Sequence, residues 1–85
     1  MTRDDALTIV RNILSDKLGV EPDEVVPDAH LRDDLALDSL DAVELIQGVQ
    51  EEFGERLAPE EVANVNTVGD VLDLMQHRAA QRAVS

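Results

Sequence analysis

Ser39 is the residue of this 85-residue sequence that is best placed to take part in chemistry. It follows Asp38, a good N-cap residue because its carboxylate can accept a hydrogen bond from a free N–H group in the first turn of a helix. Asp41 lies three residues after Asp38, where the helix dipole favours a negative charge. The start of a helix also favours a phosphate, because its free N–H groups and its dipole both stabilise an anion. We therefore expect Ser39 to present an exposed hydroxyl at a position that favours phosphate.

Nothing in the sequence around Ser39 predicts an active nucleophile. No histidine is close to it in the sequence, no nucleophile-elbow glycines flank it, and nothing places His30 or His77 beside it. Paired carboxylates are plentiful, but they lie among surface acids without the apolar surroundings that would raise the pKa of one partner. We therefore expect no catalytic residues, and a small hydrolase is the least favoured interpretation. Ser39 is instead a serine that another protein can modify.

No metal site is predicted either. The aspartates between residues 33 and 41 could attract a divalent cation weakly, but their spacing lacks the central glycine and the final glutamate of an EF-hand loop. His30 has no second histidine or cysteine at ligand spacing, and the sequence contains no cysteine at all. The lack of cysteine excludes disulfide bonds and thiolate zinc sites, and it fits a reducing compartment. We expect a cytoplasmic protein.

Residues 39–54 predict an amphipathic helix that begins at Ser39 and ends at Gly54. With about 100° between successive residues, the apolar residues form a core-facing stripe of ordinary width. Gly48 lies off that stripe and costs about 1 kcal/mol relative to alanine; a partner that approaches closely is one explanation, and a tolerated defect is the other. The stripe consists of Ala42, Leu45, Ile46, Val49 and Phe53.

The opposite face of this helix predicts a docking surface. It is mostly polar, yet it carries Leu40 and Val43 beside Ser39, and a helix that only had to fold would have little need of them. The chain has a formal net charge of −12, and residues 33–55 include eight acidic residues and no lysine or arginine. This charge argues against nucleic-acid binding, which needs a basic surface. A solvated acidic face that aids solubility is the simpler interpretation, but the two apolar residues favour a surface that docks basic partner proteins.

Helical spacing of apolar residues predicts three further helices. The first spans about residues 3–18 and ends before Gly19, a natural residue for a left-handed C-cap. A short helix is predicted at 59–64, where a proline suits the first position. The last helix is predicted at 67–80, followed by a frayed tail over 81–85.

The connection over residues 19–38 is predicted to be ordered, although Pro22 and Pro27 break any regular element within it. It contains too many aliphatic side chains for a disordered linker, and a structureless loop of about twenty residues would be unusual in so small a domain. We expect it to fold across the bundle, with a short turn of helix near residues 29–35. The prediction is one all-α domain over residues 1–85, a small four-helix bundle of three longer helices and one short one, with a long ordered loop between the first two. No apolar stretch suits a signal peptide or a membrane span, and we expect a monomer.

The residues around Ser39 resemble the signature of acyl carrier proteins. The triplet Asp-Ser-Leu at 38–40 is preceded by Asp-Leu-Ala-Leu at 34–37 and followed by Asp-Ala-Val-Glu-Leu at 41–45. Glu-Glu-Phe-Gly at 51–54 and Thr-Val-Gly-Asp-Val at 67–71 also match. The triplet alone is common by chance, but at the start of an acidic amphipathic helix in so short a domain it is a strong signal.

The resemblance implies that a separate phosphopantetheinyl transferase moves 4′-phosphopantetheine from coenzyme A onto the hydroxyl of Ser39. The terminal thiol of this arm would carry acyl groups as thioesters, which would supply the thiol that the chain lacks. The family further implies that the acidic helix docks on basic patches of the transferase and of acyl-loading, condensing and tailoring enzymes. The matching docking positions are Asp38, Leu40, Asp41, Val43, Glu44, Gln47 and Glu51.

Three departures from the family pattern leave the pathway open. Ala36 stands where many carriers have glycine, Gln50 stands where fatty-acid carriers usually have glutamate, and Leu37 is seen often in polyketide-type carriers. The sequence therefore leaves both a fatty-acid and a polyketide role open. An amino-acid-loaded carrier is a further alternative, although the Gly-Gly-x-Ser motif of peptidyl carriers is absent. The alternative from another class is an acidic helical adaptor that never carries a prosthetic group.

Overall fold

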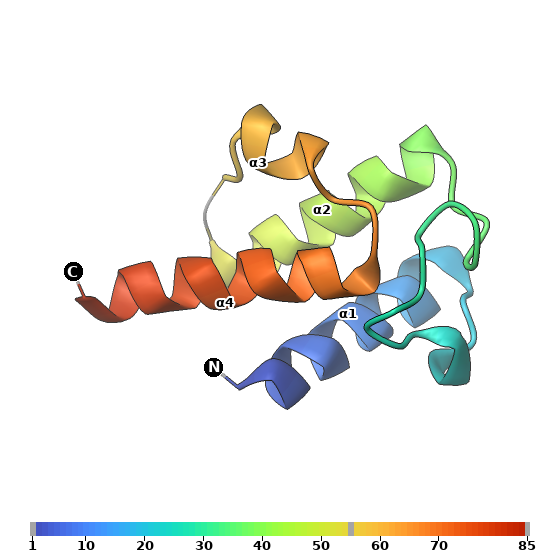
Figure 1. Ribbon diagram of the computed structural model, residues 1–85, viewed down its shortest axis with the longest axis horizontal. Coiled ribbons are helices and arrows are strands. Elements are labelled where there is room, and N and C mark those ends of the chain that lie inside the picture. The colour runs from blue at the N-terminus through green and yellow to red at the C-terminus, as the bar shows by residue number, and fades with distance from the viewer. Residues whose placement is uncertain (1, 55, 85) are drawn as a thin grey trace.

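The computed structural model describes residues 2–54 and 56–84, and their regular elements are all helical (Figure 1). This confirms the predicted all-α class. The elements in chain order are α1 (Arg3–Leu18), the short 3-10 helix η1 (Pro22–Glu24), α2 (Ser39–Phe53), α3 (Pro59–Ala63) and α4 (Val68–Val84).

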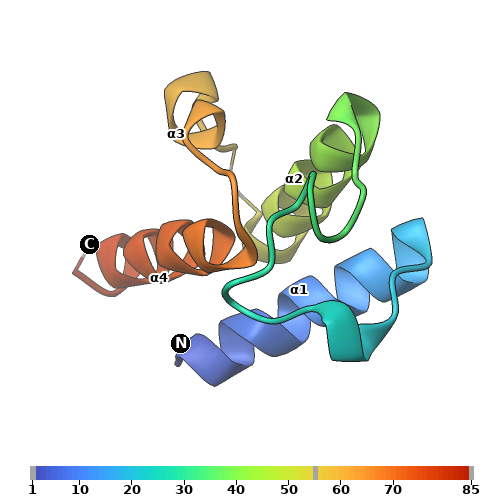
Figure 2. The same ribbon diagram turned by 45° about the vertical axis from the view of Figure 1, so that its right-hand side comes forward.

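The three longer helices pack around an aliphatic core, with α1 in contact with both α2 and α4. The short helix α3 lies on the side of the bundle away from α1 in both views (Figures 1 and 2). The predicted stripe of α2 supplies much of the core, since Leu45 and Val49 are fully buried and Ile46 and Phe53 nearly so. No helix in the described ranges is both long enough and apolar enough to span a membrane.

Gly48 lies at a close contact between α1 and α2, and the prediction that it is off the core face was wrong. It is buried, and a Cβ atom added to it would lie 2.8 Å from Cγ2 of Ile13 on α1. The helical wheel gives only the angle of each position and says nothing of how near another helix comes. Gly48 is therefore explained by the neighbouring helix, and neither a docking partner nor a tolerated defect is needed.

Polar side chains fix the helix ends as their spacing predicts. Thr2 and Asp5 form a capping box at the start of α1: the Thr2 hydroxyl accepts the Asp5 N–H at 3.1 Å, and the Asp5 carboxylate accepts the Thr2 N–H at 3.4 Å. Thr67 and Asp70 repeat this arrangement at the start of α4, with both distances 3.1 Å. Gly19 ends α1 with a φ of 68°, a left-handed conformation that glycine adopts without a steric cost.

The last helix is longer than predicted. α4 continues to Val84, so residues 81–84 are helical and the prediction of a frayed tail is wrong for them, while Ser85 lies outside the described residues. The physical reason is that residues 80–84 contain good helix formers and neither glycine nor proline, so nothing in the sequence stops the helix at residue 80.

The connection between α1 and α2 is ordered, as predicted, and it is tied to the connection between α3 and α4. Its helical turn lies at η1, where Pro22 suits the first position, whereas residues 31–35 form only a hydrogen-bonded turn. Of its six larger aliphatic side chains, only that of Val26 is exposed, at 42%. One backbone hydrogen bond joins the two connections, from Leu31 N–H to Asn66 O at 3.0 Å. Two more tie the long connection to the first two residues of α4: Val68 N–H to Ala29 O at 2.9 Å and Gly69 N–H to Pro27 O at 2.8 Å.

Candidate functional site

Ser39 is exposed at the first position of α2, between two aspartates that cap the helix. The Asp38 carboxylate accepts the Asp41 N–H at 2.9 Å, and the Asp41 carboxylate accepts the Asp38 N–H at 3.2 Å. This reciprocal pair confirms the predicted N-cap and fixes the backbone on both sides of Ser39. Among the described residues the Ser39 hydroxyl has no hydrogen-bond partner, so it is free to be modified.

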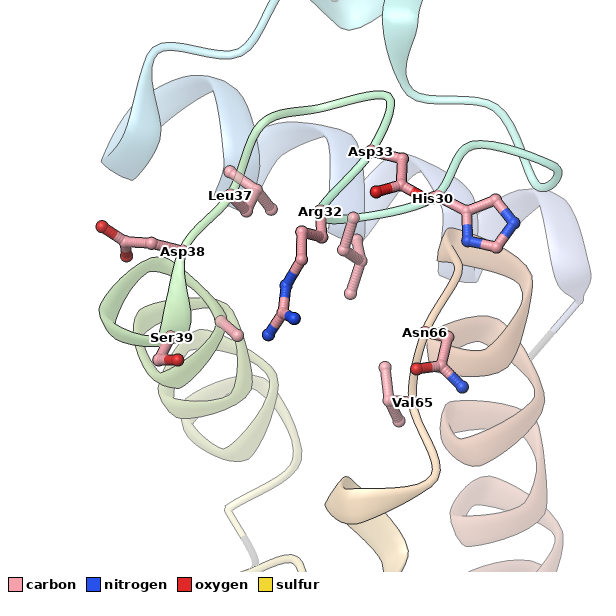
Figure 3. Close-up of a pocket in the computed structure, with 10 residues that line it drawn as sticks. His30, Arg32, Asp33, Leu37, Asp38, Ser39, Val65 and Asn66 are labelled. Carbon is pink, nitrogen blue, oxygen red and sulfur yellow. The ribbon is translucent and has the colours of Figure 1, made fainter.

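A cleft of about 570 Å³ lies beside Ser39. It is bounded by the start of α2, by residues 30–33 of the long connection, and by Val65 and Asn66 in the connection between α3 and α4 (Figure 3). Its walls combine aliphatic side chains with polar and charged ones. A chain attached to Ser39 therefore has a groove next to its point of attachment.

Asp70 braces the wall of the cleft that faces Ser39. Its carboxylate accepts the N–H groups of Asn66 at 2.9 Å and Thr67 at 3.1 Å. These two backbone hydrogen bonds, that of Asn66 first, lower the pKa of Asp70 below its ordinary value, because they stabilise the charged carboxylate more than the neutral acid. The charged form of Asp70 thus holds Asn66 in place.

Neither histidine is placed to activate Ser39. His30 lines the cleft on the side away from Ser39, and its ring points away from the serine (Figure 3). His77 lies in α4, far along the chain from the start of α2. The arrangement gives no support to the hydrolase interpretation. Within the described residues no group of three or more histidine or acidic side chains could hold a metal ion.

The outward face of α2 carries the residues predicted to dock partners. Leu40 and Val43 are 74% and 52% exposed, which is unusual for aliphatic side chains on a helix that also packs in a core. Asp41, whose carboxylate accepts the Asp38 N–H, is half-buried. The remaining predicted docking residues are all exposed: Asp38, Glu44, Gln47 and Glu51.

Arg32 is the residue at this site that the sequence-based prediction passed over. Its side chain extends from the long connection into the cleft and ends between Ser39 and Val65 in the view of Figure 3. A signal was present in the sequence, because Arg32 is the basic residue nearest to Ser39 along the chain. Its position in the cleft depends on how the connection folds, which local patterns do not reveal.

Comparison with known proteins agrees with this geometry. Residues 8–75 match the family described as "Phosphopantetheine attachment site". The chain is 44% identical over 80 residues to the acyl carrier protein of Thermosynechococcus vestitus, covering 94% of this chain and 99% of that protein. It is 43% identical over 76 residues to acyl carrier protein 2 of Ralstonia nicotianae, covering 89% of this chain and 94% of that protein. The chain therefore belongs to the acyl carrier protein family, whose members carry a covalently attached 4′-phosphopantetheine.

Proposed function

We propose that Ser39 is the attachment site of the 4′-phosphopantetheine and that the chain carries acyl groups between enzymes of a fatty-acid or polyketide pathway. The observation that carries this proposal is the position of Ser39 at the first residue of a capped helix, with an exposed hydroxyl that forms no hydrogen bond to any residue the structure describes. Ser39 also lies inside the range that matches the attachment-site family. The bound arm supplies a terminal thiol that holds acyl groups as thioesters, which the cysteine-free chain cannot do.

The residues around Ser39 fit such an arm. The capping aspartates bond to the backbone and leave the serine hydroxyl unobstructed. The neighbouring cleft of about 570 Å³ gives an attached chain a surface to lie along.

A separate transferase attaches the arm. The Ser39 oxygen forms a bond to the phosphorus of coenzyme A that bears the pantetheine. The diphosphate P–O bond breaks, adenosine 3′,5′-bisphosphate leaves, and the serine proton passes to a base. Because the His30 ring points away from Ser39 (Figure 3), that base belongs to the transferase. Ser39 is thus the acceptor of the group and performs no further chemistry.

The exposed face of α2 is the docking surface for the transferase and for the enzymes that load, condense and tailor acyl groups. Leu40 and Val43 provide an apolar centre, and acids such as Glu44 surround it. Charge complementarity speeds the encounter with a basic patch and is weakened by salt. A small interface of this kind dissociates quickly, as a carrier that visits several enzymes requires.

The mass of the intact protein tests the attachment. After incubation with coenzyme A and a promiscuous phosphopantetheinyl transferase, the wild-type chain is expected to gain the mass of one phosphopantetheine. Ser39→Ala is expected to gain nothing, whereas Ser15→Ala, which removes a serine from α1, is expected to be modified like the wild type. No mass gain by folded wild-type protein would exclude the carrier function of Ser39 and favour the adaptor alternative.

A further inference from the structure

Arg32 places a positive charge directly beside the proposed attachment site. It lines two hollows that border Ser39, the cleft of about 570 Å³ and a smaller hollow of about 320 Å³ that also includes Ala36. Its guanidinium extends into the cleft toward the start of α2 (Figure 3). Across residues 2–54 and 56–84 this guanidinium forms no hydrogen bond and no ion pair.

Two other arginines of the bundle form ion pairs, and the aspartates that cap α2 bond to the backbone. Arg78 pairs with Glu61, and Arg3 pairs with Asp73. The carboxylates of the Asp38 and Asp41 pair each accept a backbone N–H in the helix cap.

Two acids lie close to Arg32 along the chain, and neither neutralises it. Asp34 accepts the His30 N–H at 2.7 Å. Asp33 lines the same cleft but forms no ion pair with Arg32. Arg32 therefore has a free charge in a region where every other charged side chain along residues 33–54 is acidic.

We propose that Arg32 binds the phosphodiester of the arm on Ser39 and holds the arm along the cleft between visits to partner enzymes. This inference rests on the proposed attachment at Ser39. Attachment through the serine oxygen leaves one negative charge on the phosphate, next to the carboxylates of Asp38 and Asp41 that repel it. Arg32 supplies the compensating cation, and a guanidinium suits phosphate oxygens because two of its N–H groups can donate in parallel.

The covalent link determines which anion Arg32 meets. The phosphate is bonded to the Ser39 side chain, so it remains beside the cleft at a high effective concentration whatever acyl group the arm carries. An ion pair between exposed groups is weak, so Arg32 positions the arm without trapping it. Arg32 is a positioning residue that gives the arm one preferred position along the cleft.

Nuclear magnetic resonance of the holo protein tests this inference. The wild type is compared with Arg32→Gln, with Arg32→Lys, and with Arg56→Gln, a control that removes the same charge from another exposed arginine, located after α2. In the wild type we expect the Arg32 Nε–Hε resonance to shift between apo and holo forms. We expect the ³¹P resonance of the arm to shift in Arg32→Gln, to shift less in Arg32→Lys, and to stay at the wild-type position in Arg56→Gln. Salt at 1 M, where the Debye length is about 3 Å, is expected to bring the wild-type ³¹P resonance toward that of Arg32→Gln.

An Arg32 Nε–Hε resonance that is identical in apo and holo wild type would overturn the inference, and this comparison needs no variant to fold. A ³¹P shift in Arg32→Gln no larger than that in Arg56→Gln would also overturn it. In both cases the gain in mass on modification would still show that the arm is attached. Failure to gain that mass would instead overturn the attachment and, with it, the role of Arg32.

Discussion

Cγ2 of Ile13 on α1 lies 2.8 Å from the place where a Cβ of Gly48 on α2 would be. Two further side-chain atoms of Ile13 lie at 3.2 and 3.3 Å from the same point. The isoleucine side chain thus occupies the space that the glycine leaves, and the two helices approach each other through this pair. The helix that presents Ser39 is held against the bundle at a position with no side chain of its own.

Replacing Gly48 by alanine is expected to destabilise the protein, although alanine is the better helix former. Overpacking costs about 1–3 kcal/mol, whereas the gain in helix propensity is about 1 kcal/mol, so we expect a net loss of up to about 2 kcal/mol in the free energy of unfolding. Urea denaturation measures it. Ile13→Ala should make the Gly48→Ala change less costly in a double-mutant cycle, and a Gly48→Ala protein more stable than the wild type would contradict the close contact.

Ala36 has a φ of 55°, a left-handed conformation that costs a residue with a side chain about 1–2 kcal/mol. Ala36→Gly removes this strain but adds about 0.4–1 kcal/mol of entropy to the unfolded chain, so we expect a modest rise in melting temperature. Ala80→Gly is the control, because Ala80 is exposed within α4, where glycine costs about 1 kcal/mol relative to alanine and relieves no strain. The two substitutions should therefore change the melting temperature in opposite directions. A fall for both would show that the backbone at residue 36 is not strained.

Asp70 is expected to make stability depend on acid pH. The backbone N–H groups of Asn66 and Thr67 lower the pKa of Asp70. The stabilisation that charged Asp70 gives the folded state is therefore complete above the ordinary aspartate pKa, and it is lost as the pH falls through the lowered value. Asp70→Asn should be less stable than the wild type by about 1 kcal/mol at pH 7, and the difference should shrink below about pH 4. Asp23→Asn controls for the general effect of removing a negative charge, since Asp23 is exposed. If the difference in the free energy of unfolding between wild type and Asp70→Asn does not change with pH, the charge of Asp70 does not stabilise the start of α4.

Reversing one charge on the outward face of α2 should slow modification by the transferase. Glu44→Lys places a cation beside Leu40 and Val43, where a basic partner would meet it, and we expect the rate to fall about tenfold or more. Glu52→Lys makes the same change at another exposed position of α2 outside the proposed docking surface and should have a much smaller effect. Rates are measured by mass spectrometry at several salt concentrations, and the wild-type rate should fall as salt increases. Equal rates for the two variants would remove this face from the interface.

The residues close to Ser39 along the chain could be placed from the sequence because their geometry is local. A capping box needs only two suitable side chains three residues apart, so Asp38 and Asp41 located the start of α2 without knowledge of the rest of the fold. The exposure of Leu40 and Val43 followed in the same way from the period of the helix.

The features that sequence patterns did not reveal depend on segments that meet only after folding. Gly48 is explained by a side chain of another helix, and the place of Arg32 in the cleft depends on the path of a connection that has no regular repeat. Ala36 lies between these two cases. The sequence shows alanine where many carriers have glycine, but it does not show that the backbone at this residue is left-handed and strained.

The three hydrogen bonds that join the α1–α2 connection to Asn66 and to the first two residues of α4 are not among the hydrogen bonds that hold a helix together. Far-ultraviolet circular dichroism reports mainly helices, so rupture of these bonds would leave the spectrum almost unchanged while separating the walls of the cleft. A carrier that has lost the groove beside Ser39 would therefore still give the circular dichroism spectrum of a folded protein. The amide protons of Leu31 and Val68 would reveal the loss, because their exchange with solvent accelerates once the long connection separates from Asn66 and from the start of α4.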